Sequence, residues 1–154
     1  MRTATSRLRG LVLALGLAAG ALSCGPGPDA GVLRFATDDF DLRVSADVMP
    51  PRAVEEITYT IVVRDKATDE PIANGEGRIF ATNADHKTVW NGLEYGPEVG
   101  TYRARLRFLT AGEWAMGIQF RRDSTEALQR THDWRQQVKN ETPNPTPATA
   151  PVTP

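Results

Sequence analysis

The sequence predicts an all-β protein, an antiparallel β-sandwich built from about seven short strands. Apolar and polar residues alternate with a period of two over several segments, which is typical of strands that bury one face. Stretches that contain Gly or Pro separate these segments and can turn the chain. We therefore place the sandwich at residues 31–123.

Four segments show the alternation most clearly. Their apolar members are Phe40, Leu42, Val44, Ala46 and Val48, then Ile57, Tyr59, Ile61 and Val63, then Tyr102, Ala104, Leu106 and Phe108, and finally Trp114, Met116, Ile118 and Phe120. The short link Thr110-Ala111-Gly112 between the last two segments predicts a hairpin. Less regular strands are expected over 32–36, 77–82 and 87–93.

The segment before this hairpin resembles a corner motif of immunoglobulin-like domains. Glu98-Val99-Gly100-Thr101-Tyr102 matches the pattern Asp-x-Gly-x-Tyr, with Glu in place of Asp. In such a corner Gly100 allows a tight approach and the Tyr102 hydroxyl bonds to upstream backbone. The motif predicts an immunoglobulin-like sandwich in which 102–109 is the penultimate strand and 113–122 the last. The alternative is that Tyr102 is only a core aromatic residue.

Residues 1–23 have the pattern of an export signal. Arg2, Arg7 and Arg9 precede an uncharged run from Leu11 to Leu22, which is too short to span a bilayer as a permanent helix. Gly20-Ala21-Leu22-Ser23-Cys24 resembles a bacterial lipobox, and this resemblance implies lipidation of Cys24 and a membrane anchor. Residues 24–30 would be a flexible tether. A cleaved secretory protein with an incidental Cys24 is the alternative.

The sequence also bears on membrane location, on net charge and on disulfide bonds. Gly25 follows Cys24 where Asp would favour inner-membrane retention, so we expect the outer membrane where one exists. The signal holds three of the 18 Lys and Arg residues and none of the 19 acids, so the remaining chain is weakly acidic. An acidic domain is a poor partner for nucleic acid. A single cysteine excludes an intrachain disulfide.

The C-terminal region predicts a short helix and a disordered tail. Asp123 or Ser124 can cap a helix over 124–140, with Ala127, Leu128, Trp134 and Val138 on a loose apolar stripe. Residues 141–154 are rich in Thr and Pro and cannot form a core.

The stretch from Glu55 to Arg122 resembles the YtkA-like, or FixH-related, family of bacterial envelope domains. The resemblance lies in Tyr59-Thr60-Ile61-Val62-Val63-Arg64-Asp65, in Glu70-Pro71-Ile72-Ala73, in Gly100-Thr101-Tyr102-Arg103-Ala104 and in Ala111-Gly112-Glu113-Trp114. It implies a β-sandwich at the cell envelope and an association with copper handling or respiratory oxidase assembly.

The residue types that carry catalysis or bind metals are sparse. Copper sites in the envelope use clustered Met and His, but Met49, His86, Met116 and His132 are widely spaced. Ser45 and Ser124 have neither a nucleophile elbow nor an evident His partner. We therefore expect no enzyme activity, no metal site and no cofactor.

The alternation places Arg103, Arg105 and Arg107 on one outward face. Three guanidinium groups beside the small residues Ala115 and Gly117 could hold an anionic partner. The alternative is a solvated face paired with acids such as Asp41 or Glu113. The leading function is thus a lipid-anchored binding or accessory module that engages an envelope protein or an anionic surface ligand. The alternatives are copper handling or oxidase assembly, and a carbohydrate-binding module, although Trp90 and Trp134 are expected to be buried.

Overall fold

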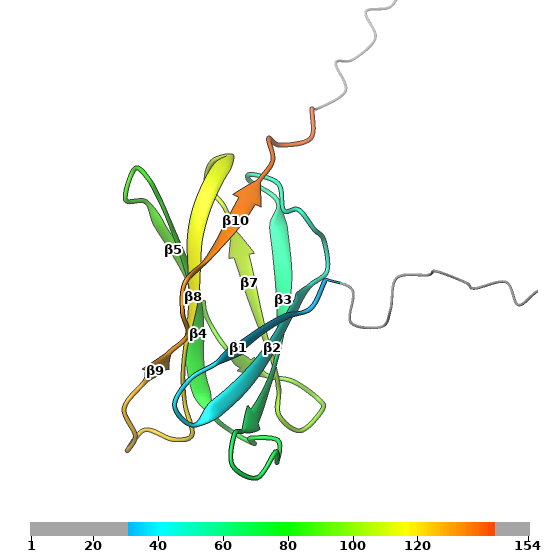
Figure 1. The fold of residues 1–154 in the computed structure, drawn as a ribbon. Coiled ribbons are helices and arrows are strands. Elements are labelled where there is room, and N and C mark those ends of the chain that lie inside the picture. Colours follow the sequence, from blue (N-terminus) through cyan, green and yellow to red (C-terminus); the bar gives the residue numbers. More distant parts are fainter. Residues whose placement is uncertain (1–30, 144–154) are drawn as a thin grey trace, which may run out of the picture.

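The computed structural model describes residues 31–143, and these residues form two antiparallel sheets without a helix (Figure 1). The first sheet has the order β1-β2-β3-β7-β6, and the second has the order β10-β8-β4-β5 with β9 also on β8. The first sheet comprises β1 (Leu33–Ala36), β2 (Phe40–Ala46), β3 (Glu56–Asp65), β6 (Glu94–Tyr95) and β7 (Thr101–Arg107). The second comprises β4 (Glu76–Asn83), β5 (Thr88–Gly92), β8 (Gly112–Arg121), β9 (Gln129–Arg130) and β10 (Trp134–Val138). The predicted β-sandwich is confirmed.

The predicted signal, Cys24 and the tether all lie outside the described residues, as does the tail from residue 144. Among residues 31–143 no helix is present that could cross a membrane.

The core lies between the two sheets and takes its members from the alternating positions. Its largest fully buried side chains are Trp114, Tyr102, Phe40, Phe108 and Phe120. Phe120 meets Phe40 and Tyr102 edge to face, with ring centroids 5.0 and 5.2 Å apart. Because Phe40 and Tyr102 belong to the first sheet and Phe120 to the second, these contacts join the two layers.

The predicted hairpin between residues 102–108 and 114–120 is wrong. β7 pairs with β3 and β6, whereas β8 pairs with β4, β9 and β10. Residues 108–111 therefore carry the chain from one sheet to the other. Phe108 and Trp114 pack edge to face across this crossing, and Trp114 Nε1 donates a hydrogen bond of 3.0 Å to the Thr110 carbonyl. Alternation shows only that each strand has one inward face, so strands from opposite sheets have the same pattern as hairpin partners.

The predicted helix over 124–140 is also wrong, because this segment forms β9 and β10. Gln136 and Val138 are buried while Arg135 and Gln137 are exposed, which is a strand pattern. A helix here would leave the edge of β8 without hydrogen-bond partners. Asp123, the expected cap, instead closes a turn, since its Oδ1 accepts hydrogen bonds from the backbone N–H and hydroxyl of Thr125.

The Tyr102 hydroxyl ties the start of β7 to the connection between β3 and β4. It donates to the Ile72 carbonyl at 2.7 Å and accepts from the Gly75 N–H at 2.8 Å. Burial raises the pKa of this hydroxyl, so it stays protonated and able to donate. Gly100 has a φ of +78°, and a Cβ there would lie 2.6 Å from Pro71 Cβ. The close approach therefore requires glycine.

The position of this corner in the chain differs from the expectation. β7 is followed by β8, β9 and β10, so residues 102–109 are not in the penultimate strand and 113–122 are not in the last. The strands that complete the second sheet lie in the segment assigned to the helix.

Tyr102→Phe is expected to lower the free energy of unfolding by about 1–2 kcal/mol, because the buried Ile72 carbonyl and Gly75 N–H lose their partner. Urea unfolding measures the change. Tyr95→Phe is the matched control, since the Tyr95 ring contacts Tyr102 but is 42% exposed. Equal stability of the two variants would show that the Tyr102 hydroxyl contributes nothing.

Asp65 ties the end of β3 to the end of β8. Its Oδ2 accepts a hydrogen bond from Arg122 at 2.5 Å, and its Oδ1 accepts from the N–H groups of Ala67 and Thr68, both at 2.8 Å. The Arg122 guanidinium, followed by the two N–H groups, lowers the pKa of this carboxyl from 3.8 to about 2. The ionised carboxylate is thus the form that the fold binds.

Because the folded-state pKa lies below the unfolded value, this tie should stabilise the fold fully above pH 3.8 and be lost as the pH falls toward 2. Asp65→Asn should lower stability at neutral pH and flatten its decline over that acid range. Thermal unfolding at several pH values measures both effects. Asp85→Asn, at the exposed tip of the β4–β5 hairpin, should retain the decline of the parent protein; the same decline in Asp65→Asn would contradict the assignment.

Candidate functional site

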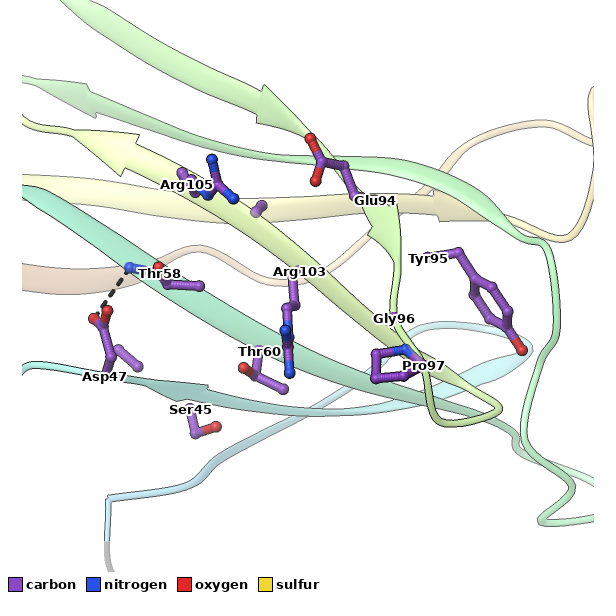
Figure 2. Close-up of a pocket in the computed structure, with 12 residues that line it drawn as sticks. Ser45, Asp47, Thr58, Thr60, Glu94, Tyr95, Gly96, Pro97, Arg103 and Arg105 are labelled. Carbon is purple, nitrogen blue, oxygen red and sulfur yellow. Dashed lines mark hydrogen bonds between the residues drawn. The ribbon is translucent and has the colours of Figure 1, made fainter.

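A groove of about 560 Å³ lies on the outer face of the first sheet. Figure 2 shows its lining residues, which come from β2, β3, β7 and the segment around β6. Its polar side chains are Ser45, Asp47, Thr58, Thr60, Glu94, Arg103 and Arg105. Tyr95 also lines it, but its ring lies on the side of the sheet where Tyr102 lies, with the two ring centroids 5.3 Å apart. Two of the three predicted arginines therefore lie in one concave site.

The strand register explains why these side chains meet. Tyr102, Ala104 and Leu106 are buried, so the intervening arginines of β7 face solvent. Arg103 lies opposite Thr60 of β3 and Glu94 of β6. Thr60 in turn lies opposite Ser45 of β2, which completes a row across four strands. Arg105 lies one row further along, opposite Thr58.

Arg107 does not share this site. It is exposed on the same strand and lies opposite Glu56, but it does not line the groove. Of the three arginines predicted to act together, Arg103 and Arg105 therefore line the groove, and Arg107 lies outside it. The difference offers a natural control for experiments on the groove.

Within residues 31–143, none of the three guanidinium groups forms an ion pair. The acids expected to neutralise them have other neighbours. Glu113 contacts Arg135 at 2.9 Å, and Asp41 lies opposite Arg64. The expected neighbours Ala115 and Gly117 are on β8, in the other sheet, because the hairpin that would have placed them beside β7 is absent.

The groove also contains two acids. Asp47 Oδ1 accepts a hydrogen bond of 3.0 Å from the Thr58 N–H, so this carboxylate is part of the wall. Glu94 lies on β6 opposite Arg103. Figure 2 shows the Arg103 side chain beside Thr60, with Glu94 on the other side of β7 from Thr60. Two cations and two acids give the lining a balanced charge, so binding there depends on short-range hydrogen bonds more than on a long-range field.

The edge of β7 is blocked beside the groove. The Arg105 N–H donates a hydrogen bond of 3.2 Å to the side-chain oxygen of Asn91 on β5. Arg105 lies beyond the end of β6, where the edge of β7 would otherwise be open. Because the Asn91 side chain accepts from the Arg105 N–H, that N–H cannot pair with an added strand. A ligand is therefore expected to lie on the face of the sheet rather than to extend it.

The other candidates from the sequence do not meet in one place. Met116 is buried, and the Tyr59 hydroxyl contacts its sulfur at 3.6 Å. His86 is exposed in the β4–β5 turn, and His132 is exposed between β9 and β10. Across residues 31–143 no group of three or more His, Cys, Asp or Glu side chains could hold a metal ion.

Neither candidate serine has a catalytic setting. Ser45 lines the groove, but no histidine lines it with Ser45. Ser124 is exposed in the connection after β8.

The prediction that Trp90 is buried is wrong. Its side chain is 62% exposed on the outer face of the second sheet. Trp134 is half-buried and stacks on Phe35, with ring centroids 4.6 Å apart. The irregular pattern of residues 87–93 did not reveal which residues of β5 face inward.

No family model matches the sequence, and none of the curated proteins matches it. Among solved structures, the fold is similar to the crystal structure of a DUF4426 family protein from Pseudomonas aeruginosa. The two chains share 13% sequence identity and superpose with a TM-score of 0.54, over 73% of this chain and 98% of the other. At this identity the similarity shows a common fold alone, and the resemblance to the YtkA-like family stays a hypothesis.

Proposed function

We propose that this chain is a non-catalytic, lipid-anchored binding module of the bacterial envelope that holds an anionic partner in the groove beside β7. The observation that supports this proposal is the pair Arg103 and Arg105, which line a hydroxyl-rich groove without an ion-pair partner among the described residues. Unpaired guanidinium groups in a concave site favour carboxylate or phosphate ligands.

The spacing of the two arginines suits an extended ligand. Outward residues on one strand lie about 6.6 Å apart, so Arg103 and Arg105 can each bind one acidic group of a partner segment. The hydroxyls of Ser45 and Thr60 continue the row from Arg103 across the sheet and can donate to the same ligand. Asp47 and Glu94 would repel acidic groups placed elsewhere in the groove, which would fix the position of the ligand.

The connectivity of the strands supports an immunoglobulin-like assignment. The order β2-β3-β7-β6 faces β10-β8-β4-β5, which corresponds to strands A, B, E and D facing G, F, C and C′. Domains of this architecture commonly bind through exposed sheet faces or loops. The YtkA-like assignment is a finer form of the same proposal and depends on the residue resemblance alone.

The proposed location depends on residues 1–30. The basic start, the uncharged run and Cys24 at its end support export and lipidation, and Gly25 supports the outer membrane. The tether would then hold the sandwich close to the membrane surface.

The double substitution Arg103→Gln with Arg105→Gln is expected to weaken binding of a short poly-glutamate peptide by about tenfold or more, because two charge-assisted hydrogen-bond donors are lost. Calorimetry measures the affinity. Added salt should weaken binding to the parent protein in the same direction.

Arg107→Gln is the control, since it removes the same charge from the same strand outside the groove. It should change the affinity by less than about twofold, and the stability of all variants should stay within about 0.5 kcal/mol. A poly-lysine peptide of equal length should not bind. Equal affinity of the double variant and the parent for poly-glutamate would contradict the proposal.

Lipidation is tested separately at Cys24. A labelled fatty acid should enter the wild-type protein, and Cys24→Ala should lose both the label and the association with the membrane fraction. Ser23→Ala keeps a small residue before the cysteine and should retain both. A wild-type protein without label and absent from membranes would refute the anchor.

A further inference from the structure

A second concave site lies on the outer face of the second sheet, which the proposed function does not use. It has a volume of about 190 Å³ and is lined by Arg78, Phe80, Thr88, Trp90, Gln119 and Arg130. We call it the Trp90 pocket. Among residues 31–143, Trp90 is the most exposed of the large apolar side chains, and its indole is available for a ligand in this pocket.

The aromatic part of this pocket is set by the strand register. Phe80 lies opposite Trp90 on one side and opposite Gly117 on the other. A Cβ at Gly117 would lie 2.6 Å from Phe80 Cζ, so the Phe80 ring occupies the space above this glycine. Phe80 and Trp90 are therefore cross-strand neighbours on the outer face of the second sheet, and both line the pocket.

One side of the pocket is held in place by an ion pair. The Arg130 guanidinium lies 4.8 Å from the centre of the Phe80 ring, in cation–π geometry. Both carboxylate oxygens of Asp133 accept hydrogen bonds from Arg130, at 2.7 and 2.8 Å. This carboxylate orients Arg130 and offsets its charge.

Arg78 supplies a cation that is still available. Its Nε donates a hydrogen bond of 2.7 Å to Gln119 Oε1, which orients the guanidinium. No acid of residues 31–143 forms an ion pair with it, because the nearby Glu76 pairs with Arg121 at 2.7 Å. Its remaining N–H groups can therefore bind a carboxylate.

We infer that the Trp90 pocket binds an acidic saccharide, with a pyranose ring on the Trp90 indole and the sugar carboxylate on Arg78. The face of an aromatic ring is electronegative, and the C–H groups on one face of a pyranose are weakly positive and apolar. The Gln119 oxygen accepts from Arg78, so its amide N–H groups can donate to sugar hydroxyls, and the Thr88 hydroxyl, which shares a hydrogen bond with Thr82, has a further lone pair to accept one. No acidic side chain lines the pocket, so its charge favours an anionic sugar over a neutral one.

The test uses the purified full chain with oligogalacturonate and with hyaluronan oligosaccharides, two probes that carry uronic acids. Trp114 is buried and Trp134 half-buried, so Trp90 is the tryptophan whose fluorescence a ligand can change most directly. At least one probe should shift the emission to shorter wavelength and bind measurably by calorimetry. Trp90→Ala should weaken this binding by about tenfold or more, and Arg78→Gln by a similar factor.

Three controls make the result decisive. Arg107→Gln removes an exposed arginine outside both sites and should leave saccharide binding unchanged. Arg103→Gln with Arg105→Gln should also leave it unchanged, so failure at one site is distinguishable from failure at the other. A neutral galactose oligomer should bind at least about tenfold more weakly than its acidic counterpart.

The inference is overturned if neither uronic probe binds at millimolar concentration, or if Trp90→Ala binds as the parent does. Equal affinity for neutral and acidic oligomers would overturn the role of Arg78. Binding of poly-glutamate that depends on Trp90 and exceeds the saccharide affinity would assign the pocket to an acidic peptide instead.

Discussion

The Tyr102 hydroxyl fixes the relation between the core and the outer face of β7. Its two hydrogen bonds join the start of this strand to the connection after β3, which is also the neighbour of β7 in the sheet. Side chains alternate along a strand, so a slip of one residue would bury Arg103 and expose Tyr102. Burial of an unpaired guanidinium carries a large desolvation cost, which disfavours the slipped register. The corner thus determines that the arginines meet Thr58 and Thr60 in the groove.

The two sheets carry sites of different electrostatic character. On the first sheet, Arg103 and Arg105 share their groove with Asp47 and Glu94, so charges of both signs have to be matched by a ligand. On the second, acids are absent from the lining of the Trp90 pocket. Since the core separates the two outer faces, one ligand cannot occupy both sites. Under the two proposals, the domain would contact a partner with one sheet and a glycan with the other.

The two-layer β architecture could be predicted because a strand that buries one face has apolar and polar residues in alternation. The alternation also predicted that Arg103 and Arg105 face outward, which the burial of Tyr102 and Ala104 bears out. Alternation does not indicate which strands pair with each other. For this reason the hairpin predicted between the strands around Phe108 and Trp114 was wrong. The groove itself depends on register across β2, β3, β6 and β7, which brings together residues up to 60 positions apart and cannot be read from spacing.

The prediction for residues 124–140 failed because a capping signal at Asp123 or Ser124 and a loose apolar stripe favoured a helix, whereas the segment forms β9 and β10. Local signals describe what a segment prefers alone, whereas the unpaired edge of β8 determines what it does in the fold. Because β9 pairs with β8 opposite Gln119, Arg130 is carried to the outer face and over the Phe80 ring. A helix would have placed Arg130 elsewhere and left the Trp90 pocket without one of its sides. The second site is therefore a product of tertiary pairing, and this explains why reasoning from local sequence could not find it.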